Sequence, residues 1–130
     1  MLLTKSFYID VTTTLDVINI GHEVRRAVRE NRVEHGQITL VIPNPGAAVA
    51  VMESDCKIPN IKKGLEGFLA SGVISSLIPK TLVLPVEAGR MSIEPWQEVF
   101  LIDYDTSARR REFRVQLNWE QKKENDGQRT

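Results

Sequence analysis

The stretch that decides the fold is residues 82–105, which read LVLPVEAGRMSIEPWQEVFLIDYD. Its apolar start predicts a strand, and a glycine turn at Gly89 leads into a short returning strand. Pro95 has no backbone N–H to donate, so it predicts a corner at which regular strand pairing stops. A third strand follows and ends near Asp105. The stretch therefore predicts antiparallel β-structure built from consecutive strands.

The sequence before this stretch predicts two helices and further strands. Apolar side chains recur every three to four positions over residues 20–31 and 59–71, which is the period of a helix with one buried face. Alternating apolar side chains over residues 3–12 and 37–43 predict strands. The apolar run 47–52 predicts a central strand that is buried on both faces. Two helices and about seven strands, mostly antiparallel, make the expected fold α+β.

The second helix combines an apolar stripe with two glycines. Its stripe consists of Ile61, Leu65, Phe68 and Leu69. Gly64 and Gly67 each cost about 1 kcal/mol relative to alanine in a helix, so we interpret them as positions of close packing.

The last two strands are predicted to form a hairpin. Residues 100–104 and 113–119 both alternate apolar and polar side chains. A register with Asp103 opposite Arg114 keeps the two apolar faces together, whereas a slip of one residue separates them. The same register places an acid opposite a base on the other face. The connecting turn, residues 106–111, is then polar and basic.

Composition indicates one folded domain over residues 1–119, since 42% of the chain is hydrophobic. Residues 120–130 have no apolar side chain and predict a disordered polar tail. The single cysteine, Cys56, excludes an internal disulfide and favours a reducing, cytoplasmic setting. We expect no signal peptide and no membrane span, because no apolar run approaches the roughly 20 residues that a spanning helix needs.

The charge balance argues against a nucleic-acid partner. Lys plus Arg and Asp plus Glu number 17 each, so the formal net charge is zero. Arg25, Arg26 and Arg29 therefore favour a solvated helix face over a nucleic-acid surface. A near-neutral surface favours self-association.

The histidines give no catalytic or metal-binding pattern. His22 and His35 have no close sequence partner that could complete a metal site, so we predict two surface histidines and no metal. No dinucleotide fingerprint or phosphate-binding glycine loop is present, so we expect no cofactor. Glu53 follows the apolar run and is either a pocket carboxylate or an ordinary loop acid.

Two charged clusters near the C-terminus have alternative interpretations. Asp103 and Asp105 share one face of a strand and are suited to acid–base chemistry or to cation binding. An ion pair between Asp103 and Arg114 is the simpler interpretation. Arg109, Arg110 and Arg111 are candidates for holding an anion such as phosphate, or they form a solvated turn.

In their order and spacing, several motifs resemble those of the YjbQ family, whose members are often named secondary thiamine-phosphate synthase. The likeness covers nearly all of residues 1–118. The matching positions are 42–48 (IPNPGAA), Glu53, 75–76 (SS), 82–86 (LVLPV), 89–90 (GR), 96–97 (WQ), 103–105 (DYD), 109–111 (RRR) and 115–116 (VQ).

The chain departs from the family pattern at its histidines. Asn44 stands where the family has a histidine after the proline, and Gly72 stands where a histidine is expected before the two serines. The histidine-rich segment of the family is missing. Asn44 donates a hydrogen bond but cannot transfer a proton near neutral pH. The resemblance thus implies a site without the family's metal-binding and catalytic histidines, and no catalytic residue can be named.

The resemblance implies a homotrimer, with sheets packed around a threefold axis and pockets between subunits. Asn44, Glu53, Trp96 and Gln97 are the implied pocket residues, and a small phosphorylated compound is the implied ligand. Two functions are open: weak thiamine-phosphate synthase-like activity, or a non-catalytic ligand-binding or structural homotrimer. Whether His22 or His35 reaches a neighbouring subunit's pocket is also open.

Overall fold

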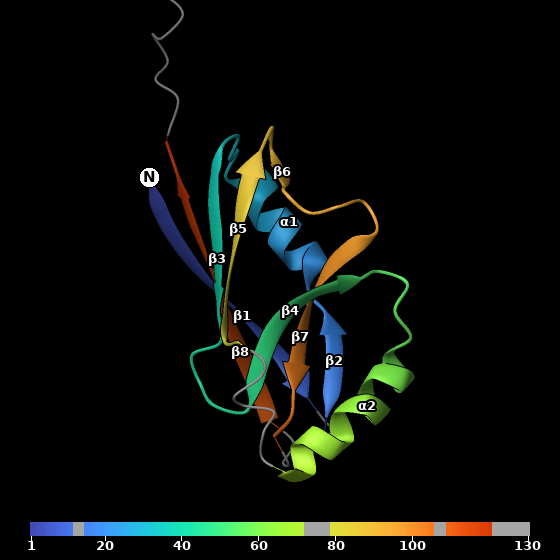
Figure 1. Cartoon of the computed structure of the whole chain (residues 1–130). Helices are drawn as coiled ribbons and strands as arrows, with labels where there is room; N and C mark the ends of the chain where they lie inside the picture. The colour runs from blue at the N-terminus through green and yellow to red at the C-terminus, as the bar shows by residue number, and fades with distance from the viewer. Residues whose placement is uncertain (12–14, 72–78, 106–108, 121–130) are drawn as a thin grey trace, which may run out of the picture.

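The computed structural model describes residues 1–11, 15–71, 79–105 and 109–120. These residues form two helices and eight strands, which confirms the α+β class (Figure 1). None of the described helices is long and apolar enough to cross a membrane. The predicted tail lies outside the described residues, apart from Glu120. In chain order the elements are β1 (Leu2–Val11), β2 (Asp16–Asn19), α1 (Gly21–Glu30), β3 (Gly36–Val41), β4 (Ala47–Glu53), α2 (Ile58–Ser71), β5 (Thr81–Glu87), β6 (Arg90–Met91), β7 (Gln97–Asp103) and β8 (Arg109–Trp119).

The strands form two antiparallel sheets. The larger sheet has the order β1-β8-β3-β5-β6, and the smaller sheet has the order β2-β7-β4. α1 lies over one face of the larger sheet, beside the smaller sheet (Figure 1). α2 lies on the far side of the smaller sheet, against β2. The arrangement is therefore layered, with the smaller sheet between α2 and the main core.

The smaller sheet is buried on both faces because a different apolar cluster lies on each side. Val99 and Leu101 of β7 belong to the main core, together with α1 and the inner face of the larger sheet. Phe100 and Ile102 of the same strand belong to a second cluster that is covered by α2. As a result, all residues of β7 after Gln97 are buried.

The predicted hairpin between residues 100–104 and 113–119 is wrong. Asp103 lies opposite Ala47 of β4, whereas Arg114 lies opposite Ser6 of β1, in the other sheet. The alternating pattern of β8 correctly predicts one buried face, and Phe113 is fully buried. Such a pattern does not identify the neighbouring strand, because any strand that offers an apolar face satisfies it.

The prediction that residues 47–52 form a central strand is also wrong. Ala47, Ala48 and Val49 are buried, but β4 is an edge of the smaller sheet and β7 is its central strand. The N–H of Val49 donates to the carbonyl of Pro79 at 3.0 Å, so the segment before β5 covers this edge. The short strand β2 is not predicted by the sequence pattern.

α2 packs more loosely than its sequence predicts. Ile61 and Leu65 contact the cluster beneath it, but the side chain of Phe68 is 45% exposed. Gly64 and Gly67 face open space, since an added Cβ would meet no described atom within 4 Å. The interpretation of these glycines as positions of close packing is therefore wrong for the described chain.

Candidate functional site

The four predicted pocket residues do not come together within one chain. Glu53 and Gln97 lie opposite each other in the β4–β7 register, and the carbonyl of Trp96 accepts the Ser54 N–H at 2.7 Å. Asn44 precedes the other end of β4. That strand has seven residues, so its ends lie roughly 20 Å apart at about 3.3 Å per residue. Within a single chain, Asn44 is therefore remote from the other three.

The corner predicted at Pro95 is held by a pair of hydrogen bonds. The Gln97 N–H donates to the Glu94 carbonyl at 2.9 Å, and the Glu94 N–H donates to Gln97 Oε1 at 2.8 Å. This closed turn presents the Trp96 side chain outward, where 58% of it is exposed. Gln97 thus has a structural role that the sequence does not indicate.

The three arginines at 109–111 open β8 and do not lie in a turn, which corrects the prediction. The guanidinium of Arg111 is buried, with Nε 2.9 Å from Asp103 Oδ2. Its Nη1 donates to the carbonyl of Pro45 at 3.0 Å. Asp103 therefore forms an ion pair with Arg111, and the predicted pair with Arg114 is wrong.

The other candidates near β8 are occupied by local contacts. The guanidinium of Arg110 lies 4.6 Å from the ring centroid of Tyr8, at cation–π distance. Arg114 Nε instead lies 2.9 Å from Glu112 Oε2. Asp105 Oδ2 is 3.7 Å from Arg111 Nη2, so the two aspartates share one arginine. This cluster joins the two sheets.

The histidines lie at the surface. His22 and His35 are both exposed. No group of three His, Cys, Asp or Glu side chains in the described part of the chain is placed to hold a metal ion. Gly72 and the serines at 75–76 lie outside the described residues.

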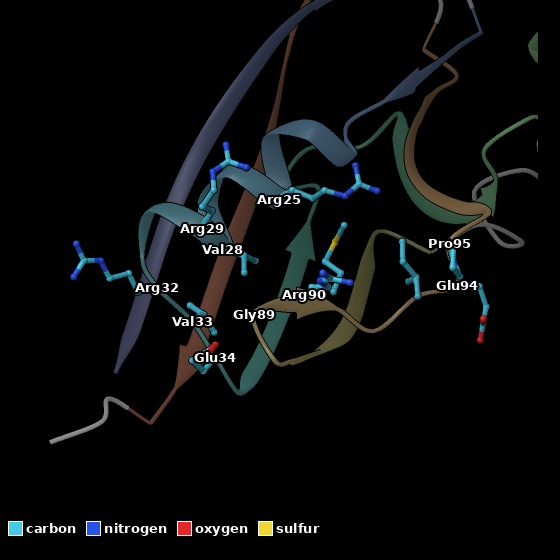
Figure 2. A pocket seen from close by; sticks show the side chains of 12 residues that line it. Arg25, Val28, Arg29, Arg32, Val33, Glu34, Gly89, Arg90, Glu94 and Pro95 are labelled. Atoms are coloured by element: carbon cyan, nitrogen blue, oxygen red, sulfur yellow. The ribbon is translucent and has the colours of Figure 1, made fainter. Parts of the chain in front are cut away.

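The described residues form a pocket of about 630 Å³ between α1 and the β5–β6 hairpin (Figure 2). Its inner wall is apolar and includes Val28, Val33 and Met91, all of which are buried. Ile93 and Pro95 extend this wall toward the corner before β7. The charged lining residues are Arg25, Arg29, Arg32, Glu34, Arg90 and Glu94.

The helical side of the pocket follows from the amphipathic pattern of α1. Its apolar stripe, which includes Val24 and Val28, packs into the main core. Arg25 and Arg29 are four residues apart and line one edge of the helix, and Arg32 follows just after the helix end. The guanidinium groups of Arg29 and Arg32 extend outward and do not converge on one point (Figure 2).

The hairpin side of the pocket is set by a tight turn. Ala88 and Gly89 both have positive φ, at +52° and +78°, as in the two-residue turns that match the twist of a hairpin. The Gly89 N–H donates to the Glu34 carbonyl at 3.0 Å. This bond ties the hairpin tip to the segment after α1, and both Glu34 and Gly89 line the pocket.

The arginines of the pocket differ in their partners. Arg25 Nη2 lies 2.8 Å from Oε1 of Glu98, a buried acid. Among the described residues, Arg29, Arg32 and Arg90 have no ion-pair partner. Arg29 is expected on a solvated face, Arg90 enters the sequence analysis only as part of the 89–90 motif, and Arg32 is not singled out. The four-residue spacing of Arg25 and Arg29 is the sequence signal that could have indicated this side of the pocket.

Comparison with known proteins shows which family and which solved structures this chain resembles. Residues 58–120 match the family model described as UPF0047 protein YjbQ-like. A YbjQ-like protein of unknown function from Sulfolobus solfataricus P2 superposes with a TM-score of 0.82, at 16% identity, over 92% of this chain and 99% of that one. An uncharacterised YjbQ/UPF0047 family protein from Clostridium acetobutylicum has a TM-score of 0.76 and 18% identity, over 88% of this chain and 99% of that one. Residues 58–120 of this chain are YjbQ-like, and the chain as a whole has the fold of YjbQ-like proteins.

Other comparisons agree on the fold. A conserved hypothetical protein from Thermus thermophilus has a TM-score of 0.64 and 26% identity, over 84% of this chain and 97% of that one. No curated protein matches this YjbQ-like chain. The family match spans α2 to β8, so it includes the hairpin side of the pocket but not α1.

Proposed function

We propose that this YjbQ-like protein binds a small phosphorylated ligand in the pocket between α1 and the β5–β6 hairpin. The observation that carries the proposal is a set of three arginines, Arg29, Arg32 and Arg90, without an ion-pair partner among the described residues, at the edge of an apolar pocket. A guanidinium presents paired N–H donors that match phosphate oxygens, and it keeps its charge at all physiological pH values.

The dimensions of the pocket favour an organic phosphate over inorganic phosphate. Its volume of about 630 Å³ falls within the usual range for small-molecule sites. The apolar wall of Val28, Met91 and Ile93 offers burial for a carbon skeleton. Binding at this wall contributes free energy through apolar area, while the arginines select the charged group.

The residues of the pocket support binding better than catalysis. Its described lining contains arginines, two glutamates and apolar side chains, and it lacks a serine, cysteine or histidine to serve as nucleophile or proton carrier. The thiamine-phosphate synthase-like activity implied by the family resemblance stays a prediction. Complementation of a strain without its main thiamine-phosphate synthase tests it, and rescue would favour an enzyme over a binding protein.

The binding proposal is tested by titrating the full chain with phenyl phosphate in a calorimeter. We expect saturable binding that weakens about tenfold in Arg29→Ala and in Arg90→Ala, since each removes a charged donor to the anion. Arg114→Ala is the matched control, because Arg114 lies on β8 outside the pocket. The proposal fails if the wild-type chain does not bind, or if the control weakens binding as much as the pocket variants do.

The assembly that completes this proposal is a cytoplasmic homotrimer with sheets packed about a threefold axis and with no nucleic-acid or membrane partner. Supporting it are the zero net charge and the exposed Tyr8 and Val83 on the outer face of the larger sheet, opposite the core. Light scattering of the purified chain tests the stoichiometry. A monomer at micromolar concentration would overturn the trimer without affecting the pocket.

A further inference from the structure

We infer that the pocket takes an amphipathic anion in one orientation, with its anionic group at Arg32 and its apolar body toward Met91 and Ile93. In this inference, which rests on the proposed function, Arg32 is the main binding residue. The evidence is the backbone conformation of Arg32, its lack of a structural partner among the described residues and its place at one end of the pocket.

Arg32 occupies a position at the end of α1 that favours glycine. The Val33 N–H donates to the Val28 carbonyl at 3.2 Å, and the Arg32 N–H donates to the Arg29 carbonyl at 3.2 Å. These two bonds form the Schellman motif that ends many helices, and both Val28 and Val33 belong to the main core. The motif places the residue just after the helix end in the left-handed conformation, and Arg32 has φ +53°. A Cβ makes this conformation unfavourable, so arginine here lowers stability relative to glycine.

No described contact of the Arg32 side chain offsets this cost. Arg32 is exposed. Within the described residues, its guanidinium forms no ion pair, hydrogen bond or ring contact. Strained residues that persist without structural compensation concentrate at functional sites, where a ligand supplies the missing interaction. Ligand binding is the role that the surroundings of Arg32 support, because its side chain lines the pocket.

The distribution of charge along the pocket gives the orientation. Arg32 and Arg29 lie at one end, and Glu94 and Pro95 lie at the other (Figure 2). Glu34 also lies at the Arg32 end, where its carboxylate faces the hairpin turn at Gly89. At this end two arginines outweigh the single carboxylate of Glu34, whereas Glu94 repels an anionic group at the other end. The apolar body of the ligand then lies along the wall between the two ends.

The test compares two replacements of Arg32 in the full chain. Arg32→Gly removes both the charge and the strain, whereas Arg32→Ala removes the charge and keeps the strain. Arg26→Ala is the matched control, because Arg26 lies on the same helix but does not line the pocket. Each variant is titrated with phenyl phosphate by calorimetry and unfolded by heat without ligand.

We expect phenyl phosphate to bind Arg32→Gly and Arg32→Ala at least tenfold more weakly than wild type, and Arg26→Ala to bind as wild type does. We expect the Tm of Arg32→Gly to rise by about 4 °C above wild type, and that of Arg32→Ala not to rise. In NMR spectra, phenyl phosphate should shift the Met91 and Ile93 methyl signals more than inorganic phosphate does.

Three results separate the possible failures. If wild type binds phenyl phosphate and Arg32→Gly binds it equally well, the role of Arg32 is wrong while the proposed function stands. If the Tm of Arg32→Gly does not rise, the strain argument is wrong. If wild type binds no phenyl phosphate, the proposed function fails and this inference fails with it.

Discussion

Arg111 and Asp103 form a buried ion pair that joins the two sheets. Arg111 Nε lies 2.9 Å from Asp103 Oδ2, and their side chains are only 3% and 0% exposed. Arg111 belongs to β8 in the larger sheet, and Asp103 is the last residue of β7 in the smaller sheet. Two ionised groups taken out of water are tolerated only while each neutralises the other.

Removing one partner should therefore destabilise the fold strongly. We expect Arg111→Ala to lower the free energy of unfolding by about 3–5 kcal/mol, because the buried ion pair between Arg111 and Asp103 is then broken. The measurement is urea denaturation at neutral pH. Arg114→Ala, which breaks an exposed pair with Glu112, is the control and should cost no more than about 1 kcal/mol. Equal effects of the two substitutions would contradict the structural role of Arg111.

Gly46 lies beside the same ion pair and should not tolerate a side chain. Its φ is +102°, and an added Cβ would lie 2.9 Å from Asp105 Oδ2 and 3.0 Å from Arg111 Nη2. We expect Gly46→Ala to cost about 1–3 kcal/mol in denaturation experiments, from backbone strain and from displacement of the charged groups. Gly64→Ala is the matched control and should stabilise α2 by about 1 kcal/mol, since it meets open space. If Gly46→Ala leaves the free energy of unfolding unchanged, the charged groups beside it move aside without cost, which contradicts this prediction.

Gly21 makes room for Glu98 at the start of α1. A Cβ on Gly21 would overlap the Glu98 carboxylate, which in turn binds Arg25 at the pocket. Gly21→Ala should therefore lower stability, and the loss should shrink in a Glu98→Ala background where the overlap is absent. A double-mutant cycle by urea denaturation measures this coupling, which we expect to reach about 1 kcal/mol. Additive effects would show that the two residues do not compete for the same space.

The carboxyl group of Glu112 should titrate below its ordinary pKa of 4.5. A hydrogen bond from Arg114 lowers the pKa most, and a second from Ser6 adds to it, because both favour the ionised form. A depressed folded-state pKa contributes stability above the unfolded pKa, and this stability is lost as the pH falls through the folded pKa. In Arg114→Ala, NMR titration of the carboxyl carbon should give a higher pKa than in wild type. An unchanged value would rule out Arg114 as the main cause.

Local features of the fold were predictable, and long-range ones were not. The helix over residues 20–31, the positive φ of Gly89 and the buried face of β8 each follow from a few neighbouring residues. The pairing partners of β7 do not follow from its neighbouring residues. Both faces of β7 are buried, and the clusters that bury them come from distant parts of the chain. Strand pairing depends on which apolar faces meet, and alternation alone does not specify it.

The candidate site shows the same limit. The spacing of Arg25 and Arg29 places them on one helix edge, yet the same spacing is typical of a solvated face. The pocket forms because the hairpin tip lies opposite that edge. A hydrogen bond from the Gly89 N–H to the Glu34 carbonyl holds the tip there. Those two residues lie far apart in the sequence. No local pattern at either position predicts that they meet.

The position of β8 between β1 and β3 has a consequence for synthesis on the ribosome. β1 pairs with β8 from Leu2 opposite Asn118 to Val11 opposite Arg109. β1 is synthesised before β8, so it cannot pair until β8 has been made. Until residue 119 leaves the exit tunnel, β1 and β3 each lack a neighbour, and their free edges are open to association with other chains. The larger sheet is therefore complete only after this region has been translated. Before then, the unpaired edges of β1 and β3 are the surfaces that a chaperone would have to cover.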